Sequence, residues 1–146
     1  MNCTLDASVL VASSRVQEPG YAASRRLLDE ERSRGVTFFC PVLVLPESAA
    51  AVARATDDLA KAVRMVRDIR SLPRLRLVPI DDAMATRAAE IAMTRRLRGA
   101  DSVYVAVAEA FGATLITWDA EMLERAPAVV PTLTPADWPA QQPVTP

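Results

Sequence analysis

Short apolar runs alternate with amphipathic segments along most of the chain. Five of these runs are short, apolar or β-branched, and bounded by polar residues, proline or glycine, which predicts strands. They span residues 3–6, 36–40, 75–80, 114–117 and 128–130. We expect the fifth to lie at a sheet edge, because Pro131 has no N–H to donate to a ladder.

Helical patterns fill the segments between the predicted strands. Cap signals, glycines and prolines place their ends. The predicted helices cover residues 7–14, 21–34, 46–55, 59–69, 82–92, 101–111 and 120–124. Strands that alternate with helices in this way predict an α/β layer architecture with a parallel sheet.

Two features of the helical patterns make more specific predictions. Leu27 and Leu28 should face the core from the second helix. The fourth helix shows an apolar stripe, which either packs on the core or, with the alanine-rich run 49–55, forms a surface for a partner. The stripe consists of Leu59, Ala62, Val63, Val66 and Ile69.

Length and composition indicate one globular domain. The chain has 146 residues, 51% of them apolar and 24% charged, with a formal net charge of −1. Sixteen arginines accompany a single lysine, Lys61. This excess fits either a coding bias or a need for bidentate phosphate contacts. The two cysteines, Cys3 and Cys40, are too few for a zinc site and are predicted to be small buried core residues.

No apolar run approaches the ~18 residues of a membrane span, and no secretory signal is evident. We therefore expect a cytoplasmic protein that does not contact a membrane. The predicted domain covers residues 1–138, and a proline-rich tail covers residues 139–146. The chain has no histidine, which excludes histidine bases and histidine metal ligands.

Four acidic residues stand at comparable structural positions. Asp6 and Asp119 each follow a predicted strand, whereas Glu47 and Asp101 each lie in the first turn of a predicted helix. Helices on a parallel sheet run antiparallel to the strands, so all four positions fall at the carboxyl edge of the sheet. Ligands of open α/β sheets bind at that edge.

Clustered carboxylates repel one another, and a hard divalent cation such as Mg²⁺ relieves the repulsion. A cation held in this way can activate water against a phosphodiester without histidine or cysteine. The later three acids also fit structural roles, as helix caps or as partners of a helix dipole. We assign four other acids to capping: Asp57, Asp58, Asp81 and Asp82.

Several stretches resemble the PIN-domain ribonucleases, and in particular the toxins of bacterial VapBC toxin–antitoxin pairs. They are Leu5-Asp6-Ala7-Ser8, Pro46-Glu47, Gly99-Ala100-Asp101-Ser102-Val103-Tyr104-Val105-Ala106, Leu115-Ile116-Thr117-Trp118-Asp119 and Thr134-Pro135-Ala136-Asp137-Trp138. The resemblance spans nearly the whole chain and leaves only the proline-rich tail unmatched. It implies a three-layer α/β/α sandwich with a mainly parallel sheet of four to five strands.

The same resemblance implies a Mg²⁺-dependent, or Mn²⁺-dependent, endoribonuclease. By position, Asp6, Glu47, Asp101 and Asp119 would be the catalytic acids and metal ligands. Polar positions that support such a site by hydrogen bonds are matched by Ser8 and Thr117. The implied partners are an RNA substrate, a cognate antitoxin whose C-terminal segment covers the site, and a second copy in a homodimer.

Two alternatives to the nuclease stay open from the residues. One is a phospho-receiver domain, which also binds Mg²⁺ at an acidic sheet edge but needs a late lysine that is absent here. The other is a non-catalytic PIN-like module that binds RNA or an antitoxin. Arg95, Arg96 and Arg98 precede Asp101, and either contact RNA phosphates or lie in a solvated loop.

Overall fold

A computed structural model describes residues 1–138, with the side chains of Arg32 and Ser33 left aside. The predicted tail at residues 139–146 lies outside the described residues. Five short strands form the sheet. They are β1 (Asn2–Leu5), β2 (Thr37–Pro41), β3 (Leu75–Val78), β4 (Thr114–Ile116) and β5 (Thr132–Leu133).

Seven α-helices and one short 3₁₀ helix (Ala126–Ala128) occupy the rest of the described chain. The α-helices are α1 (Ala7–Ser14), α2 (Tyr21–Arg34), α3 (Val44–Thr56), α4 (Leu59–Arg70), α5 (Asp82–Arg95), α6 (Gly99–Ala110) and α7 (Ala120–Arg125). None of the helices in residues 1–138 is long and apolar enough to cross a membrane.

All neighbouring strands are parallel, in the order β3-β2-β1-β4-β5. The chain therefore builds outward from β1 in one direction and later returns to add β4 on its other side. The register pairs Leu5 with Ile116, so the residues that follow β1 and β4 emerge side by side. This reversal of strand order is where ligands of open α/β sheets bind.

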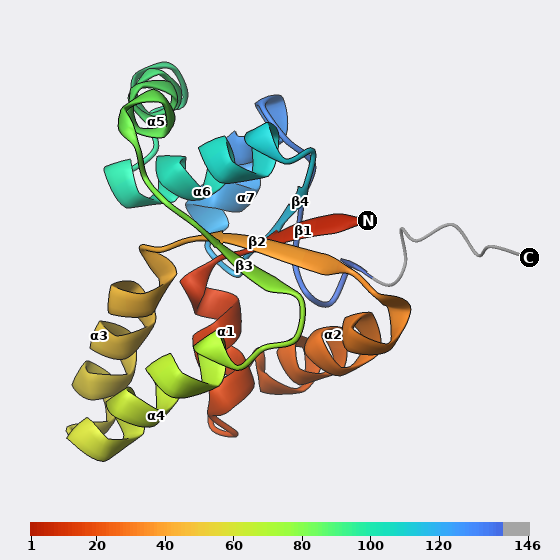
Figure 1. The fold of residues 1–146 in the computed structure, drawn as a ribbon, viewed down its shortest axis with the longest axis vertical. Helices are drawn as coiled ribbons and strands as arrows, with labels where there is room; N and C mark the ends of the chain where they lie inside the picture. Colours follow the sequence, from red (N-terminus) through yellow and green to blue (C-terminus); the bar gives the residue numbers. More distant parts are fainter. Residues whose placement is uncertain (139–146) are drawn as a thin grey trace, which may run out of the picture.

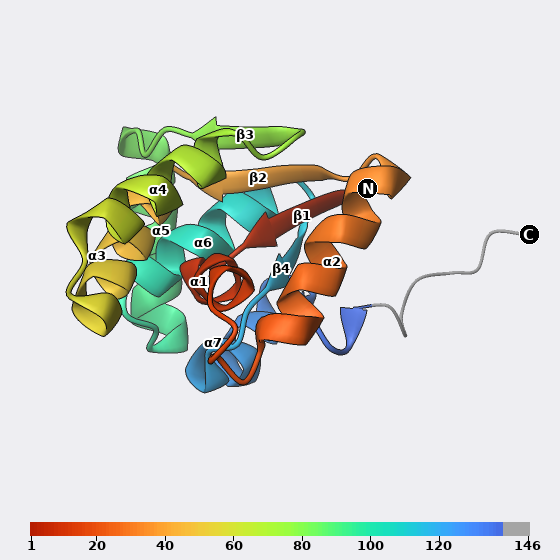
Figure 2. The same ribbon diagram turned by 90° about the horizontal axis from the view of Figure 1, so that it is seen from below.

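Helices cover both faces of the sheet, as the α/β/α prediction required. Figure 1 shows α5, α6 and α7 on one side of the strands and α1 to α4 on the other. Figure 2 shows α1 nearly end-on, with α2 and α3 to either side of it. The two helices α3 and α4 pack against each other as a hairpin at one end of the molecule (Figures 1 and 2).

The core forms mainly where sequence periodicity placed it. Leu27 and Leu28 are buried, as are Cys3 and Cys40. Burial raises the pKa of the Cys40 thiol to about 12, which keeps it protonated and unreactive at neutral pH.

The prediction of a fifth strand at residues 128–130 is wrong. Ala126–Ala128 forms a 3₁₀ turn instead, in which the Val129 and Val130 amides both donate to the Ala126 carbonyl. The strand begins two residues later, at Thr132, and the Pro131 carbonyl accepts a hydrogen bond from Leu115 at 2.9 Å. The missing N–H of proline is therefore harmless at this position.

The apolar stripe predicted on α4 is only partly buried. Ala62 and Ile69 face the core together with Met65, which the pattern omitted. Leu59 and Val63 are 79% and 60% exposed, because the buried face is centred on positions 62, 65 and 69.

The four acids assigned to capping behave differently from one another. Asp58 and Asp81 accept hydrogen bonds from backbone amides in the first turns of α4 and α5, as predicted. Asp82 lies in the first turn of α5 and contributes only its charge to the helix dipole. Asp57 ends α3 in a left-handed conformation with φ of 50°, so the prediction that it caps a helix start is wrong.

Candidate active site

The structure places the four predicted acids at the carboxyl edge of the sheet. Asp6 follows β1 and Asp119 follows β4, at the point where strand order reverses. Glu47 and Asp101 lie in the first turns of α3 and α6. Burial raises the pKa values of Asp6, Glu47 and Asp101, and the negative charges of neighbouring acids in the group add to each rise.

Asp6 is a buried acid with two side-chain hydrogen-bond donors. Its residue is 7% exposed, and its Oδ2 accepts hydrogen bonds from Ser8 Oγ at 2.6 Å and Thr117 Oγ1 at 2.9 Å. Burial raises the pKa of the Asp6 carboxyl, and the two hydroxyl donors oppose that rise by stabilising the charged form. Ser8 and Thr117 thus hold an acid in place, as their predicted supporting roles require.

The same two hydroxyls also fix the chain that follows β4. Ser8 Oγ accepts the Trp118 backbone N–H at 3.1 Å, and Thr117 Oγ1 accepts the Asp119 backbone N–H at 3.0 Å. Asp6 and Asp119 are therefore linked through side chains that bridge the ends of two adjacent strands.

Asp119 has a structural role as well as a place in the site. Its Oδ1 accepts the Met122 backbone N–H at 2.9 Å and so caps α7. Its Oδ2 points elsewhere and accepts a hydrogen bond from Arg98 at 3.0 Å. The prediction that Asp119 caps a helix is therefore correct for Oδ1, while Oδ2 faces the other acids of the site.

Arg98 bridges two of the acids with one guanidinium group. Its Nε donates to Asp101 Oδ2 at 3.1 Å, and its Nη2 donates to Asp119 Oδ2 at 3.0 Å. These contacts raise the pKa of Arg98 and oppose the rise that burial imposes on the pKa of Asp101. The spacing of Arg98 and Asp101 is a recognisable sequence signal, but nothing in the sequence indicates the contact with Asp119, 21 residues away.

Glu47 brings an unpaired carboxylate oxygen to the site. Its Oε1 is buried and has no hydrogen-bond partner among the described residues, and the same is true of the Tyr104 hydroxyl. Burial raises the pKa of Glu47, and the nearby phenol lowers it, although the two groups do not meet in hydrogen-bonding geometry. The sequence pattern predicts Tyr104 only as an apolar core residue. Its position three residues after Asp101 on α6 is the signal that both side chains face the carboxyl edge of the sheet.

The donor chemistry of this edge fits a hard divalent cation. Oxygen atoms are the ligands that Mg²⁺ prefers, and a cation is one partner that would satisfy the unpaired buried oxygen of Glu47. In the arrangement described for residues 1–138, no three His, Cys, Asp or Glu side chains are already positioned to hold a metal ion. The guanidinium of Arg98 stands in for a cation between Asp101 and Asp119.

The PIN domain family model matches residues 3–128, which include all four acids. The chain belongs to the PIN domain family. The recognition made from the sequence motifs is confirmed at the level of the family, and so is the α/β/α fold.

Solved structures share the fold of this PIN domain at low sequence identity. The Mycobacterium tuberculosis toxin VapC20, described as a sarcin–ricin loop cleaving toxin, is 17% identical with a TM-score of 0.71, over 84% of this chain and 93% of that one. A structure of VapBC2 from Rickettsia felis bound to promoter DNA gives 16% identity and a TM-score of 0.68, with coverages of 92% and 98%. FitAcB from Neisseria gonorrhoeae gives 22% identity and a TM-score of 0.67, with coverages of 92% and 98%. No curated protein matches the chain by sequence.

Arg95 and Arg96 of this PIN domain lie outside the acid group. Arg95 is exposed in the last turn of α5, and Arg96 ends that helix in a left-handed conformation with φ of 55°. Neither makes an ion pair with another described residue, and the Arg96 carbonyl accepts a hydrogen bond from Arg125. Their contact with RNA stays a prediction. Arg98 lies in the loop before α6 with 68% of its side chain exposed, and it is also paired with two acids. Its contact with RNA stays a prediction as well.

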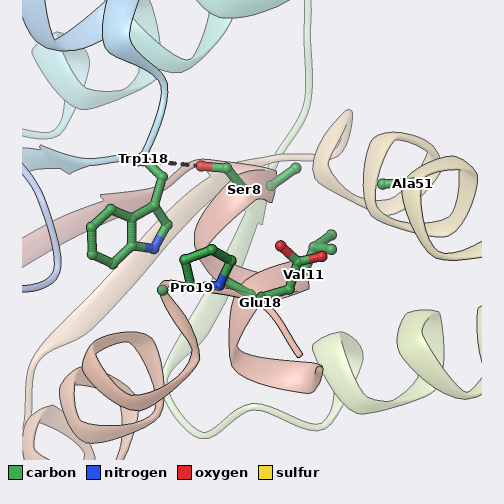
Figure 3. Close-up of a pocket in the computed structure, with 9 residues that line it drawn as sticks. Ser8, Val11, Glu18, Pro19, Ala51 and Trp118 are labelled. Carbon is green, nitrogen blue, oxygen red and sulfur yellow. Dashed lines mark hydrogen bonds between the residues drawn. The ribbon is translucent and has the colours of Figure 1, made fainter. Parts of the chain in front are cut away.

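An apolar pocket of about 460 Å³ adjoins the acids on the α1 side of the sheet. Trp118, which precedes Asp119, forms one wall, and Figure 3 shows its backbone bonded to Ser8. The indole Nε1 donates to Ser24 Oγ at 2.9 Å, which fixes the ring. The complete lining is Ala7, Ser8, Val11, Ala12, Glu18, Pro19, Gly20, Ala51 and Trp118.

Proposed function

We propose that this PIN domain is a metal-dependent endoribonuclease and the toxin of a toxin–antitoxin pair. The observation that carries the proposal is the set of four acids at the point where strand order reverses, one of them with an unpaired buried oxygen. Family membership supports a nuclease, because the motifs that carry the acids are those of PIN-domain ribonucleases. Mg²⁺ is the proposed cofactor, with Mn²⁺ as a substitute.

In this proposal Asp6, Glu47, Asp101 and Asp119 hold the cation. A bound divalent cation would supply charge neutralisation at the RNA phosphate and would activate a water molecule. Ser8 and Thr117 hold the Asp6 carboxylate in position and favour its charged form through their hydrogen bonds to its Oδ2. The unpaired Oε1 of Glu47 would be one of the oxygen ligands of the cation, and the chain has no histidine that could serve instead.

A cognate antitoxin and a second copy of the chain are the proposed protein partners. Support for the antitoxin comes from structures with this fold that are complexes of toxins with antitoxins, such as VapBC2 from Rickettsia felis. The exposed Leu59 and Val63 on α4, four residues apart, are candidates for such a contact. A cytoplasmic location is part of the same proposal, since that is where an RNA-cleaving toxin would meet its substrate.

The non-catalytic module is the alternative that remains. The phospho-receiver interpretation has lost its basis, because the motifs belong to a PIN domain and Lys61 lies on α4, outside the acid group. Intact acids at all four positions favour a catalyst over a module that only binds.

Incubation of total RNA with the purified full chain tests the proposed activity. We expect cleavage with Mg²⁺ or Mn²⁺ and none with excess EDTA. Asp6→Asn and Asp101→Asn should each lower the cleavage rate by on the order of 100-fold or more, since a cation site contributes several kcal/mol to the transition state. Asp68→Asn is the matched control, because Asp68 is exposed on α4 and outside the acid group. Full cleavage in EDTA, or by both acid variants, would refute a metal-dependent nuclease built on these acids, and RNA binding without product would favour the non-catalytic module.

A further inference from the structure

Arg98 holds an unusual position for an exposed arginine beside a proposed cation site. It precedes α6 at the N-cap position, where its extended backbone has φ of −61° and ψ of 151° and its side chain makes no capping bond. The side chain instead turns to the carboxylates of Asp101 and Asp119, although 68% of it is exposed. The guanidinium therefore contacts the acids from the side of the site that faces solvent.

The surrounding acids explain why a positive charge settles here. Asp101 is only 9% exposed, and burial together with the charges of Asp119 and Asp6 raises the pKa of its carboxyl. In the described part of the chain, Arg98 is the one basic side chain that forms ion pairs with any of the four acids. It therefore supplies the compensating charge in the protein without a cation.

The contacts of Arg98 conflict with those that a divalent cation needs. The guanidinium uses Oδ2 of Asp101 and Oδ2 of Asp119, and the other oxygen of Asp119 caps α7. A metal ion bound through those two Oδ2 atoms would share them with the guanidinium, and its charge would repel the guanidinium at that distance. The two cations therefore oppose each other's binding at this place.

We propose, on the basis of the cation site proposed above, that Arg98 is an internal counter-ion that a divalent cation must displace from Asp101 and Asp119. The exposed side chain can swing into solvent without any movement of α6, because it contributes no cap to that helix. Cation binding and the Arg98 ion pairs are then coupled with opposite sign, and each weakens the other by the same factor. The site is stable without metal and binds metal less tightly than four free acids would.

Titration of Mn²⁺ into the full chain by calorimetry tests this coupling. Arg98→Gln should bind Mn²⁺ more tightly than the unaltered chain by on the order of tenfold, within the usual range of such couplings. Arg98→Lys should fall between the two, because an ammonium keeps the charge but cannot bridge two carboxylates with a planar fork. Arg95→Gln removes the same charge from the exposed end of α5 and should leave the affinity unchanged.

A spectroscopic measurement on the unaltered chain follows the Arg98 ion pairs directly. The ¹⁵N resonance of Arg98 Nε should report an ion-paired guanidinium without metal and should shift to the position of a solvated arginine as Mg²⁺ saturates the site. The spectrum of Arg98→Lys, which lacks that resonance, assigns it. An Arg98 resonance that stays unchanged at saturating Mg²⁺ would overturn displacement.

The outcomes separate this inference from the proposed nuclease activity. If the chain cleaves RNA with Mg²⁺ while Arg98→Gln binds Mn²⁺ no more tightly than the unaltered chain, the counter-ion role is wrong and the nuclease stands. If neither the unaltered chain nor Arg98→Gln binds Mn²⁺, the cation site and the counter-ion role both fail. Tighter binding by Arg98→Gln, without any RNA cleavage, supports the counter-ion role alone.

Discussion

The Thr117 hydroxyl donates a 2.9 Å hydrogen bond to Oδ2 of Asp6, a residue 111 positions away in the sequence. The contact exists because β1 and β4 are adjacent and parallel, with Leu5 opposite Ile116, so the next residue of each strand emerges at the same edge. The same Thr117 hydroxyl accepts a hydrogen bond from the backbone N–H of Asp119. It therefore connects Asp6, the first acid of the site, to the segment that carries Asp119, the last.

Replacement of Thr117 by valine tests that connection with little change in shape. Thr117→Val removes a buried donor to Asp6 and an acceptor for the Asp119 amide, and should lower the free energy of unfolding by about 1–3 kcal/mol. RNA cleavage should fall by roughly 10–100-fold, as for other groups that orient metal ligands. Thr117→Ser keeps the hydroxyl and should retain most of the stability and most of the cleavage rate. Urea unfolding and RNA cleavage assays measure the two quantities. Equal losses in both variants would assign the effect to packing.

Stability should depend on pH in a direction set by the buried acids. Burial raises the pKa values of Asp6, Glu47 and Asp101 in the folded protein above their ordinary values of roughly 4. The folded state then binds more protons than the unfolded state, so these groups contribute stability below their ordinary pKa that is lost as pH rises through the raised values.

Urea unfolding in EDTA at several pH values from 4.5 to 7.5 measures this effect. The fall in stability with rising pH should be smaller in Glu47→Gln and Asp101→Asn than in the unaltered chain, because each variant removes one titrating group. Saturating Mg²⁺, which binds only ionised carboxylates, should flatten or reverse the fall. Identical pH profiles for all three chains would contradict the raised pKa values.

The close approach of Gly20 to Trp118 makes a prediction about the wall of the pocket. A Cβ atom added at Gly20 would lie 2.6 Å from indole atoms of Trp118, whose ring is held by Ser24. Gly20→Ala should therefore lower the free energy of unfolding by about 1–3 kcal/mol through overpacking. A Cβ at Gly99 meets no atom within 4 Å, so Gly99→Ala at the start of α6 should be neutral or slightly stabilising in the same urea titration.

Trp138 fixes the end of the described chain onto α2. Its residue is 2% exposed, and its Nε1 donates at 2.8 Å to Oε1 of Glu31, which is fully buried. Trp138→Ala should cost about 3–5 kcal/mol of stability. Deletion of residues 139–146 should leave the thermal midpoint nearly unchanged if the domain ends at 138, as proposed from the sequence. A large loss on deletion would move that boundary.

The sequence was sufficient to predict the edge at which the four acids gather. Chain direction alone places Asp6 and Asp119 after strands and Glu47 and Asp101 at helix starts, and the structure places each of them there. Such positions follow from topology and do not depend on how side chains pack.

Side-chain partners across elements were beyond the reach of the sequence. The contact of Arg98 with Asp119 and the approach of Tyr104 to Glu47 depend on how α6 sits against α7 and α3, and no periodicity encodes that packing. The fifth strand was misplaced for a local reason. Val129 and Val130 have high β-propensity, but the 3₁₀ turn that begins at Ala126 takes their amides first.

Titration of Mn²⁺ into variants of the four acids, followed by electron paramagnetic resonance, tests the shared cation site most directly. Each of Asp6→Asn, Glu47→Gln, Asp101→Asn and Asp119→Asn should weaken Mn²⁺ binding by on the order of tenfold or more, since each removes a charged oxygen ligand. The exposed Asp68→Asn should bind Mn²⁺ as the unaltered chain does. An unaltered chain that binds no Mn²⁺, or four acid variants that bind it as tightly as the unaltered chain, would contradict a cation site built from these residues.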